Sequence, residues 1–124
     1  MSDTPHFQLK TRIWVENGSG EMVFGLGRLR MLEAIGRTGS ISAAAKDLGM
    51  SYKAVWERLR VTEERLGKRL VLRQKGGAKG GSSELSDYAK QLMEGFRELH
   101  RSVVMNDDRK FEEILQPIIS SPAT

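Results

Sequence analysis

The sequence predicts a mainly α-helical fold with small β elements, a winged helix-turn-helix with an N-terminal β-hairpin and a long C-terminal helix. Three observations lead to it. Residues 39–59 read as two short helices joined by a tight glycine turn. Two β-prone runs around a glycine-rich basic loop follow, between residues 70 and 85. Beyond them, apolar residues recur at steps of three and four over residues 86–103, as on one face of a long helix.

Residues 39–59 have the caps and the turn of a helix-turn-helix. Ser40 and Ser51 stand where a serine side chain caps a helix N-terminus, and Gly49 supplies the turn between the helices. Small residues at 43–45 allow the two helices to approach closely. An αα-hairpin with a glycine turn is also common in other helical proteins, so this segment alone leaves its function open.

The second helix of the pair has two different faces. One face is apolar apart from a threonine and consists of Val55, Leu59, Thr62 and Leu66. The opposite side gathers polar and aromatic residues, namely Tyr52, Lys53, Trp56, Glu57 and Arg60. Because a recognition helix turns one face to the core and the other to the major groove, the second set is the one that DNA would meet.

Positive charge is concentrated on and just beyond this helix. The chain of 124 residues has a formal net charge of only +4. Residues 51–79, however, contain nine Lys and Arg against three Glu. Such a basic segment is the footprint expected for contact with DNA phosphates, with a solvated basic face as the alternative.

The composition argues against several other classes of function. Cysteine is absent, and His6 and His100 stand alone, so no metal site and no cofactor are expected. The sequence has no paired carboxylates and no nucleophile-base arrangement, so we do not expect an enzyme. No apolar run approaches the roughly 18–20 residues of a membrane span, and the N-terminus has no apolar signal core. We therefore expect a cytoplasmic protein of one modest domain, without membrane contact.

The N-terminal residues predict a β-hairpin followed by a helix. Residues 7–16 alternate between apolar and polar side chains, as in a half-buried strand, and residues 17–20 have strong turn chemistry. Residues 21–24 can return as the second strand. Apolar residues spaced by three then mark a first helix, which begins near Leu26, stops near Gly39 and packs across the helix-turn-helix.

Residues 70–85 predict the wing. Two β-prone runs, at residues 70–74 and 83–85, flank a glycine-rich loop with Lys75 and Lys79 at its base and tip. The loop lacks the Gly-Lys-Ser/Thr ending of a nucleotide-binding phosphate loop, so that function is not expected. Its glycines would let the main chain approach a minor groove or a sugar-phosphate backbone closely.

The C-terminal residues predict a long helix that starts at Ser86 and Asp87. Its apolar pattern is broken by residues 106–108. A last apolar segment follows, and Pro117 is expected to disturb the helix there. Its heptad-like seam marks it as a dimerisation helix, in which early turns close the monomer core and later turns meet a partner subunit; a purely intramolecular seam is the alternative. The residues assigned to dimerisation are Leu92, Phe96, Leu99 and Val103. The predicted organisation is an N-terminal β-hairpin at 1–25, a winged helix-turn-helix DNA-binding domain at 26–85, C-terminal helices for dimerisation at 86–119 and a tail at 120–124.

The side chains expected to contact DNA can be given individual roles. Ser51 caps the recognition helix and can also donate to a phosphate there. Tyr52 and Lys53 are placed to reach a phosphate or a base edge, and lysine suits guanine O6 and N7. Trp56 is assigned to the groove-facing surface, with packing against the first helix or the wing as the alternative, and Glu57 accepts from cytosine N4 or orients a neighbouring cation. Phosphate contacts are assigned to Arg60, Arg73, Lys75 and Lys79.

Several short motifs together resemble one known family. They are Thr38-Gly-Ser-Ile-Ser42, Ala45-Lys-Asp47, Gly49-Met-Ser-Tyr-Lys53 with Trp56, Leu70-Val71 with Arg73, and Gly76-Gly-Ala-Lys-Gly-Gly81 followed by Leu85-Ser86. In these the chain is similar to the N-terminal DNA-binding domain of the molybdate-responsive ModE-type regulators, distant relatives of LysR-type winged helices. The likeness covers about residues 20–105. Ser-Tyr-Lys-x-x-Trp together with the double-glycine wing is its specific part.

The resemblance implies a winged helix-turn-helix that dimerises through its N-terminal strands and long helices and binds a roughly palindromic operator. In full-length members molybdate or tungstate binds C-terminal β-barrel domains. This sequence contains neither those barrels nor their Ser-Ala-Arg-Asn-Gln-type oxyanion motif, so molybdate binding by this chain is not expected. We expect a sequence-specific, double-stranded DNA-binding transcriptional regulator that acts as a homodimer. The alternative is a winged-helix protein-interaction module that does not read DNA.

Overall fold

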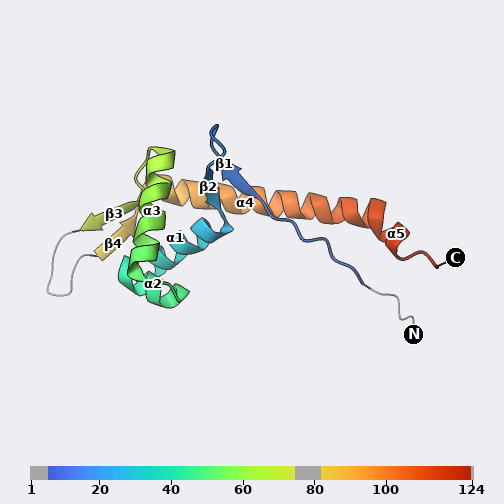
Figure 1. Cartoon of the computed structure of the whole chain (residues 1–124), viewed down its shortest axis with the longest axis horizontal. Coiled ribbons are helices and arrows are strands. Elements are labelled where there is room, and N and C mark those ends of the chain that lie inside the picture. Colours follow the sequence, from blue (N-terminus) through green and yellow to red (C-terminus); the bar gives the residue numbers. More distant parts are fainter. Residues whose placement is uncertain (1–5, 75–81, 124) are drawn as a thin grey trace. The chain divides into compact units, whose positions relative to one another are not determined.

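A computed structural model describes residues 6–74 and 82–123 of the chain (Figure 1). The fold divides into two compact units. The larger unit contains Ile13–Phe96, and the smaller one combines residues up to 12 with residues from 97 onward. One long helix, α4 (Asp87–Lys110), begins in the larger unit and continues into the smaller one.

The larger unit is a small helical domain with two short β-ribbons. Strands β1 and β2 pair antiparallel in one ribbon, and β3 and β4 pair antiparallel in the other. In chain order its elements are β1 (Trp14–Glu16), β2 (Met22–Gly25), α1 (Leu26–Thr38), α2 (Ile41–Leu48), α3 (Tyr52–Leu66), β3 (Val71–Gln74), β4 (Ser82–Leu85) and the start of α4. The mainly α-helical winged helix-turn-helix predicted from the sequence is therefore confirmed.

The ends of the helices follow the predicted chemistry. The hydroxyl oxygens of Ser40 and Ser51 accept hydrogen bonds from the N–H groups three residues ahead, at 2.9 and 3.1 Å. Gly39 and Gly49 end α1 and α2 with φ angles of 82° and 67°, in the left-handed region that side chains other than glycine rarely adopt. These two glycines turn the chain sharply enough to place α2 and α3 as a helix-turn-helix.

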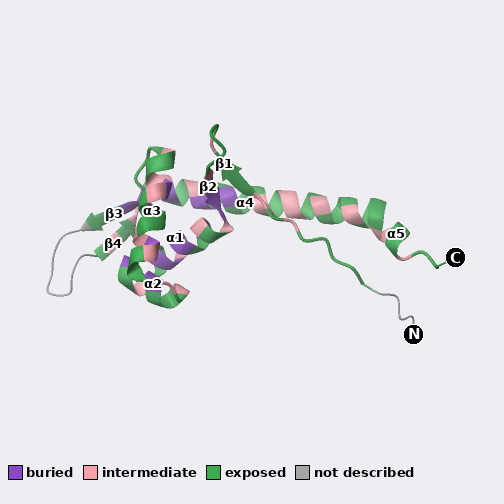
Figure 2. Cartoon of the chain, in the orientation of Figure 1, coloured by how far each residue is buried: buried purple, intermediate pink, exposed green. Residues whose placement is uncertain are grey.

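One hydrophobic core joins the three helices, β2, β3 and the first turns of α4 (Figure 2). Phe24 on β2 and Phe96 on α4 meet edge to face, with ring centroids 5.2 Å apart. The largest fully buried apolar side chains are Phe24, Leu32, Ile35, Leu59, Leu70, Val55 and Val71. Because α1, α3 and α4 all contribute, the core fixes the orientation of α3 from several sides.

Hydrogen bonds attach the base of the wing to this helical core. The carboxylate of Glu63 on α3 accepts from the backbone N–H groups of Leu70 and Val71, at 2.8 and 3.2 Å. The N–H of Ser83 on β4 donates to the carbonyl of Gly39 at 2.8 Å. The wing strands are therefore held against the end of α1 and the side of α3.

The predicted N-terminal strand is too long. The structure gives a strand only over β1, so the prediction for residues 7–13 is wrong. The partner strand β2 has four residues, because Gly25 already begins the entry into α1, and no more of the alternating segment can pair with it. Residues 6–10 are exposed, including Phe7 and Leu9, while Thr11 is partly buried and donates through its hydroxyl to the carboxylate of Asp107 at 3.2 Å.

Residues 106–108 interrupt the apolar pattern but not the helix, since α4 continues through them to Lys110. Two of these polar side chains are satisfied without leaving the helix: Asn106 accepts from Arg109 at 3.0 Å, and Asp107 accepts from Thr11. Low helix propensity is a weak signal that such contacts override. The helical path then passes through a π-helical turn, η1 (Phe111–Leu115), into α5 (Gln116–Ile119). Pro117 lies in the first turn of α5, where its missing N–H is not needed.

Candidate nucleic-acid interface

Burial decides which side of α3 is available to a ligand. Val55, Leu59 and Thr62 are buried in the core, and the residues on the other side of the helix are exposed. Tyr52 is 54% exposed although it is aromatic, and Lys53 and Glu57 are exposed beside it. The first two turns of α3 thus present aromatic, cationic and anionic groups to solvent.

Ser51 lies directly before these turns. Its side chain caps α3 and is used by the N–H of Ala54, while the residue itself stays exposed. The remaining N–H groups of the first turn of a helix have no partner within the helix, and they favour an anion. The start of α3 therefore combines free backbone donors with the ammonium group of Lys53.

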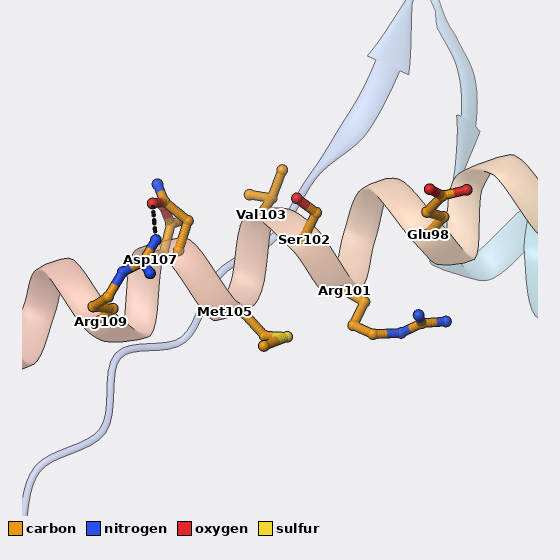
Figure 3. A pocket seen from close by; sticks show the side chains of 8 residues that line it. Glu98, Arg101, Ser102, Val103, Met105, Asp107 and Arg109 are labelled. Atoms are coloured by element: carbon orange, nitrogen blue, oxygen red, sulfur yellow. Dashed lines mark hydrogen bonds between the residues drawn. The ribbon is translucent and has the colours of Figure 1, made fainter.

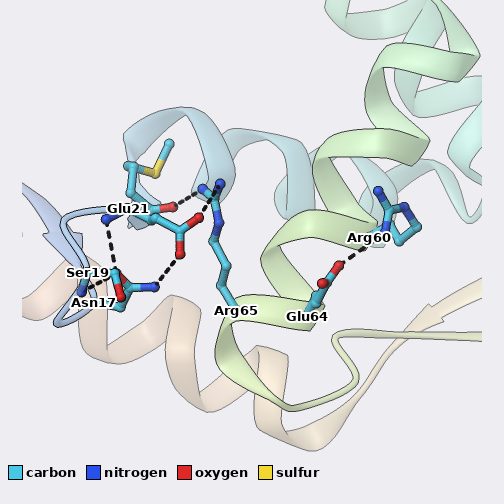
Figure 4. Close-up of polar contacts among 7 residues, drawn as sticks. Asn17, Ser19, Glu21, Arg60, Glu64 and Arg65 are labelled. Atoms are coloured by element: carbon cyan, nitrogen blue, oxygen red, sulfur yellow. Dashed lines mark hydrogen bonds and ion pairs between the residues drawn. The ribbon is translucent and has the colours of Figure 1, made fainter.

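Trp56 is not fully on the surface. It is partly buried and packs against the core, and the guanidinium of Arg60 lies 5.9 Å from its ring centroid. Arg60 also pairs with Glu64, four residues on, at 3.1 Å (Figure 4). Arg60 is therefore held beside the indole and remains exposed on the outer side of α3.

The wing contributes one described candidate. Arg73 on β3 is exposed. Lys75 and Lys79, the other two wing cations assigned to phosphate contact, lie outside the described residues.

A second group of cations, not predicted from the sequence, lies on the other flank of α3. A shallow pocket of about 490 Å³ opens there, next to the start of α1. Arginines from two helices line it, together with part of the surface already described. The lining residues are Arg28, Ser51, Lys53, Ala54, Glu57, Arg58, Val61 and Arg65. The seven-residue spacing of Arg58 and Arg65 would have revealed two of its three arginines, because it places both on one helix face. No spacing rule could have added Arg28 from α1.

The three arginines of this pocket are held differently. Arg65 donates to the carbonyl of Met22 at 2.7 Å and pairs with Glu21 at 3.2 Å, which ties the β1–β2 ribbon to α3 (Figure 4). Arg28 donates from Nε to the hydroxyl of Thr62 at 3.1 Å. Burial, and then the positive charges of Arg58 and Arg65, lower the pKa of Arg28.

The four residues assigned to dimerisation do not share one environment. Phe96 is only 4% exposed and Leu92 packs against the same core, so both are used within their own chain. Leu99 is 49% exposed, and Val103 is partly buried. Around Val103 a hollow runs along α4, lined only by residues of that helix such as Glu98, Met105 and Arg109 (Figure 3). The exposed apolar surface of α4 therefore starts at Leu99.

Residues 6–74 and 82–123 contain neither a cluster of metal ligands nor a candidate membrane span. In these ranges no group of three or more His, Asp or Glu side chains is placed to hold a metal ion. No helix within them is both long and apolar enough to cross a membrane.

Comparison with known proteins decides the family. The sequence profile of bacterial regulatory helix-turn-helix proteins of the lysR family matches residues 26–88, which is half of the chain and includes α1 to β4. The chain belongs to this lysR family. The predicted likeness to LysR-type winged helices is thereby confirmed.

Individual relatives agree with this assignment. The chain is 38% identical over 87 residues to the molybdenum transport protein ModE of Azotobacter vinelandii, covering 70% of this chain and 32% of that protein. It is 36% identical over 75 residues to the transcriptional regulator ModE of Haemophilus influenzae, covering 60% of this chain and 29% of that protein. The chain thus spans about a third of the length of these two ModE proteins.

Solved structures support the fold. The DNA-binding domain of CbnR, in a complex with DNA, is 22% identical with a TM-score of 0.54, covering 73% of this chain and 98% of that one. The DNA-binding domain of BenM, in a complex with benA site 1 DNA, is 17% identical with a TM-score of 0.53, covering 75% of this chain and 99% of that one. At this level of identity the likeness concerns the winged helix-turn-helix fold alone.

Proposed function

We propose that the chain is a sequence-specific regulator of transcription that binds double-stranded DNA with α3 in the major groove. The carrying observation is the first half of α3, where exposed Tyr52, Lys53 and Glu57 stand on a helix whose other side is fixed by the core. Membership of a family of regulatory helix-turn-helix proteins supports this assignment. So do the DNA complexes of the CbnR and BenM domains, which have the same fold.

Within this proposal the side chains divide the work. Lys53 and Tyr52 reach base edges or phosphates at the start of the groove contact, and Glu57 accepts from a base or orients Lys53. Trp56 supports Arg60 from behind and reaches the duplex only through its exposed part. Arg60 and Arg73 contact phosphates, as do the wing residues Lys75 and Lys79, whose positions the structure does not describe.

We further propose that the regulator acts as a homodimer on a roughly palindromic site. The exposed apolar side chains of the smaller unit supply a surface for a second copy. They include Leu99, Met105, Ile114, Leu115, Ile118 and Ile119. On such a palindromic site the two recognition helices would lie about one turn of DNA apart, roughly 34 Å. The protein is then a binding protein, not an enzyme.

Molybdate is not assigned to this chain. The ModE relatives match it over about a third of their own length. We expect calorimetry on this chain to show no preference for molybdate over sulfate. A saturable, molybdate-specific heat would contradict that expectation.

Titration of labelled duplex DNA at two salt concentrations tests the binding mode. Affinity should fall about 10³-fold or more between about 50 and 200 mM salt, because phosphate contacts release counterions. Lys53→Ala should weaken binding about ten-fold and leave the stability of the fold unchanged. Lys90→Ala, which removes an exposed lysine at the start of α4, is the matched control and should change the affinity less than two-fold.

Two results would count against the proposal. If the wild-type chain does not bind duplex DNA, the protein-interaction alternative takes its place. If Lys53→Ala and Lys90→Ala have equal effects, DNA does not meet the start of α3.

A further inference from the structure

The pocket on the α1 flank of α3 brings together more positive than negative charge. Four cationic side chains line it, from Arg28, Lys53, Arg58 and Arg65, against the single carboxylate of Glu57. Glu21 neutralises Arg65 from outside the lining. An excess of cations in a concave site attracts an anion more strongly than the same charges spread over a flat surface.

Arg28 and Arg58 are the cations that remain available. Among the described residues, neither forms an ion pair with a carboxylate. Within residues 6–74 and 82–123, Arg58 makes only a long contact with the sulfur of Met50, at 3.9 Å. Arg28 uses Nε for Thr62, and no hydrogen bond joins its two terminal nitrogens to another residue of the described part.

Thr62 fixes the direction in which Arg28 points. This threonine is buried, donates to the carbonyl of Arg58 at 2.6 Å and accepts from Nε of Arg28. A guanidinium bound through Nε keeps its terminal nitrogens as a planar pair of donors, which matches two oxygens of a phosphate. Thr62, the polar residue on the apolar face of α3, thus orients the guanidinium of Arg28.

The arrangement costs the free protein some stability. The lowered pKa of Arg28 reflects partial burial first and repulsion by Arg58 and Arg65 second. A bound anion would remove both penalties, because it replaces the lost hydration and offsets the like charges. Uncompensated cations held together in this way are typical of a ligand site.

We propose that this pocket binds a phosphate group of the DNA backbone, with Arg28 and Arg58 as donors and Thr62 as the positioning residue. The inference rests on the proposed function, and it extends the DNA surface from the wing flank of α3 to the α1 flank. Ser51 and Lys53 belong to both surfaces, so they join the pocket to the groove-facing side. A strand that passes the start of α3 would bring a phosphate over Arg28 and Arg58.

Salt-dependent DNA titration of single variants tests the site. Arg58→Gln should weaken binding about ten-fold for specific and mixed-sequence duplexes alike, and it should reduce the slope of log K against log salt by about 1. Thr62→Val keeps every charge and a similar shape but removes the acceptor for Arg28, so it should weaken binding several-fold with little change in the slope. Arg30→Gln, an equal loss of charge at an exposed position of α1 outside the pocket, is the control and should change affinity less than two-fold.

Inorganic phosphate separates the two sources of the anion. If millimolar phosphate raises the melting temperature of the wild type but not of Arg58→Gln, the pocket also takes a free oxyanion. If only the duplex titrations respond, the site is specific for the DNA backbone. If the wild type does not bind DNA but binds phosphate through Arg58, the proposed function is wrong, while the pocket remains an anion-binding site. Equal behaviour of Arg58→Gln and Arg30→Gln in both experiments would overturn the inference.

Discussion

The two parts of helix α4 use their apolar side chains in opposite ways. In the first ten residues Ala89, Met93 and Phe96 are buried against the winged helix. From Leu99 onward no residue of the helix is buried, and Met105 is 65% exposed (Figure 2). The helical path then ends with further exposed apolar residues at 114–119.

A single repeating pattern therefore covers two environments. The sequence steps by three and four without a break from Ala89 to Val103, yet the core ends at Phe96. An apolar seam that continues after its own core is finished leaves surface that water solvates poorly. This difference is the reason to place the partner subunit on the second part of α4 and not on the first.

The largest effect is expected from Phe96→Ala. It should lower the free energy of unfolding by about 3–5 kcal/mol, because it removes the ring that packs on Phe24 and leaves a cavity. Met105→Ala, on the exposed part of the same helix, should change it by no more than about 0.5 kcal/mol at protein concentrations low enough to keep the chain monomeric. Urea unfolding monitored by circular dichroism compares the two. Similar losses for both variants would show that the second part is buried as deeply as the first.

Leu99→Glu addresses the partner surface. A charge at this exposed apolar position should raise the dissociation constant of the dimer about 100-fold, equivalent to about 2.7 kcal/mol, because it would be buried unpaired between subunits. Sedimentation velocity measures the change. Lys90→Glu, on the exposed side of the first part, is the control and should leave the dimer intact. A monomeric wild type would contradict the proposal that this surface binds a second copy of the chain.

The smallest effect concerns the smaller unit alone. Thr11→Val removes the hydrogen bond from the threonine hydroxyl to Asp107 and should destabilise the local structure by about 0.5–1.5 kcal/mol. Amide exchange in residues 6–12 should become faster, while exchange in α3 stays the same. Unchanged exchange in residues 6–12 would mean that this bond does not hold the segment.

Local signals in the sequence were sufficient for most of the fold. Serine caps at Ser40 and Ser51, with left-handed turns at Gly39 and Gly49, depend on a few neighbouring residues, and the structure has them where they were predicted. The predicted length of the N-terminal strand was wrong because that length depends on the partner strand β2. The polar residues 106–108 do not end α4, because contacts from Arg109 and Thr11 satisfy the side chains of Asn106 and Asp107.

The sequence predicted only part of the candidate site, because contacts between different helices do not follow from local spacing. Lys53 and its neighbours share one helix, so their common face follows from spacing. The α1 flank brings Arg28 together with Arg58, thirty positions later in the chain, and only the packing of α1 on α3 does this. Phe96 illustrates the same limit for the core. Its position in the apolar seam of α4 does not reveal that Phe24 on β2 packs against it.

Selection from a pool of genomic fragments tests the central claim most directly. The chain should retain a small set of fragments, and footprinting should reveal two half-sites related by two-fold symmetry and separated by about one helical turn, roughly 10 base pairs. That result is predicted for a dimer with one α3 in each half-site. Retention of all fragments equally, or protection of a single unpaired half-site, would contradict it.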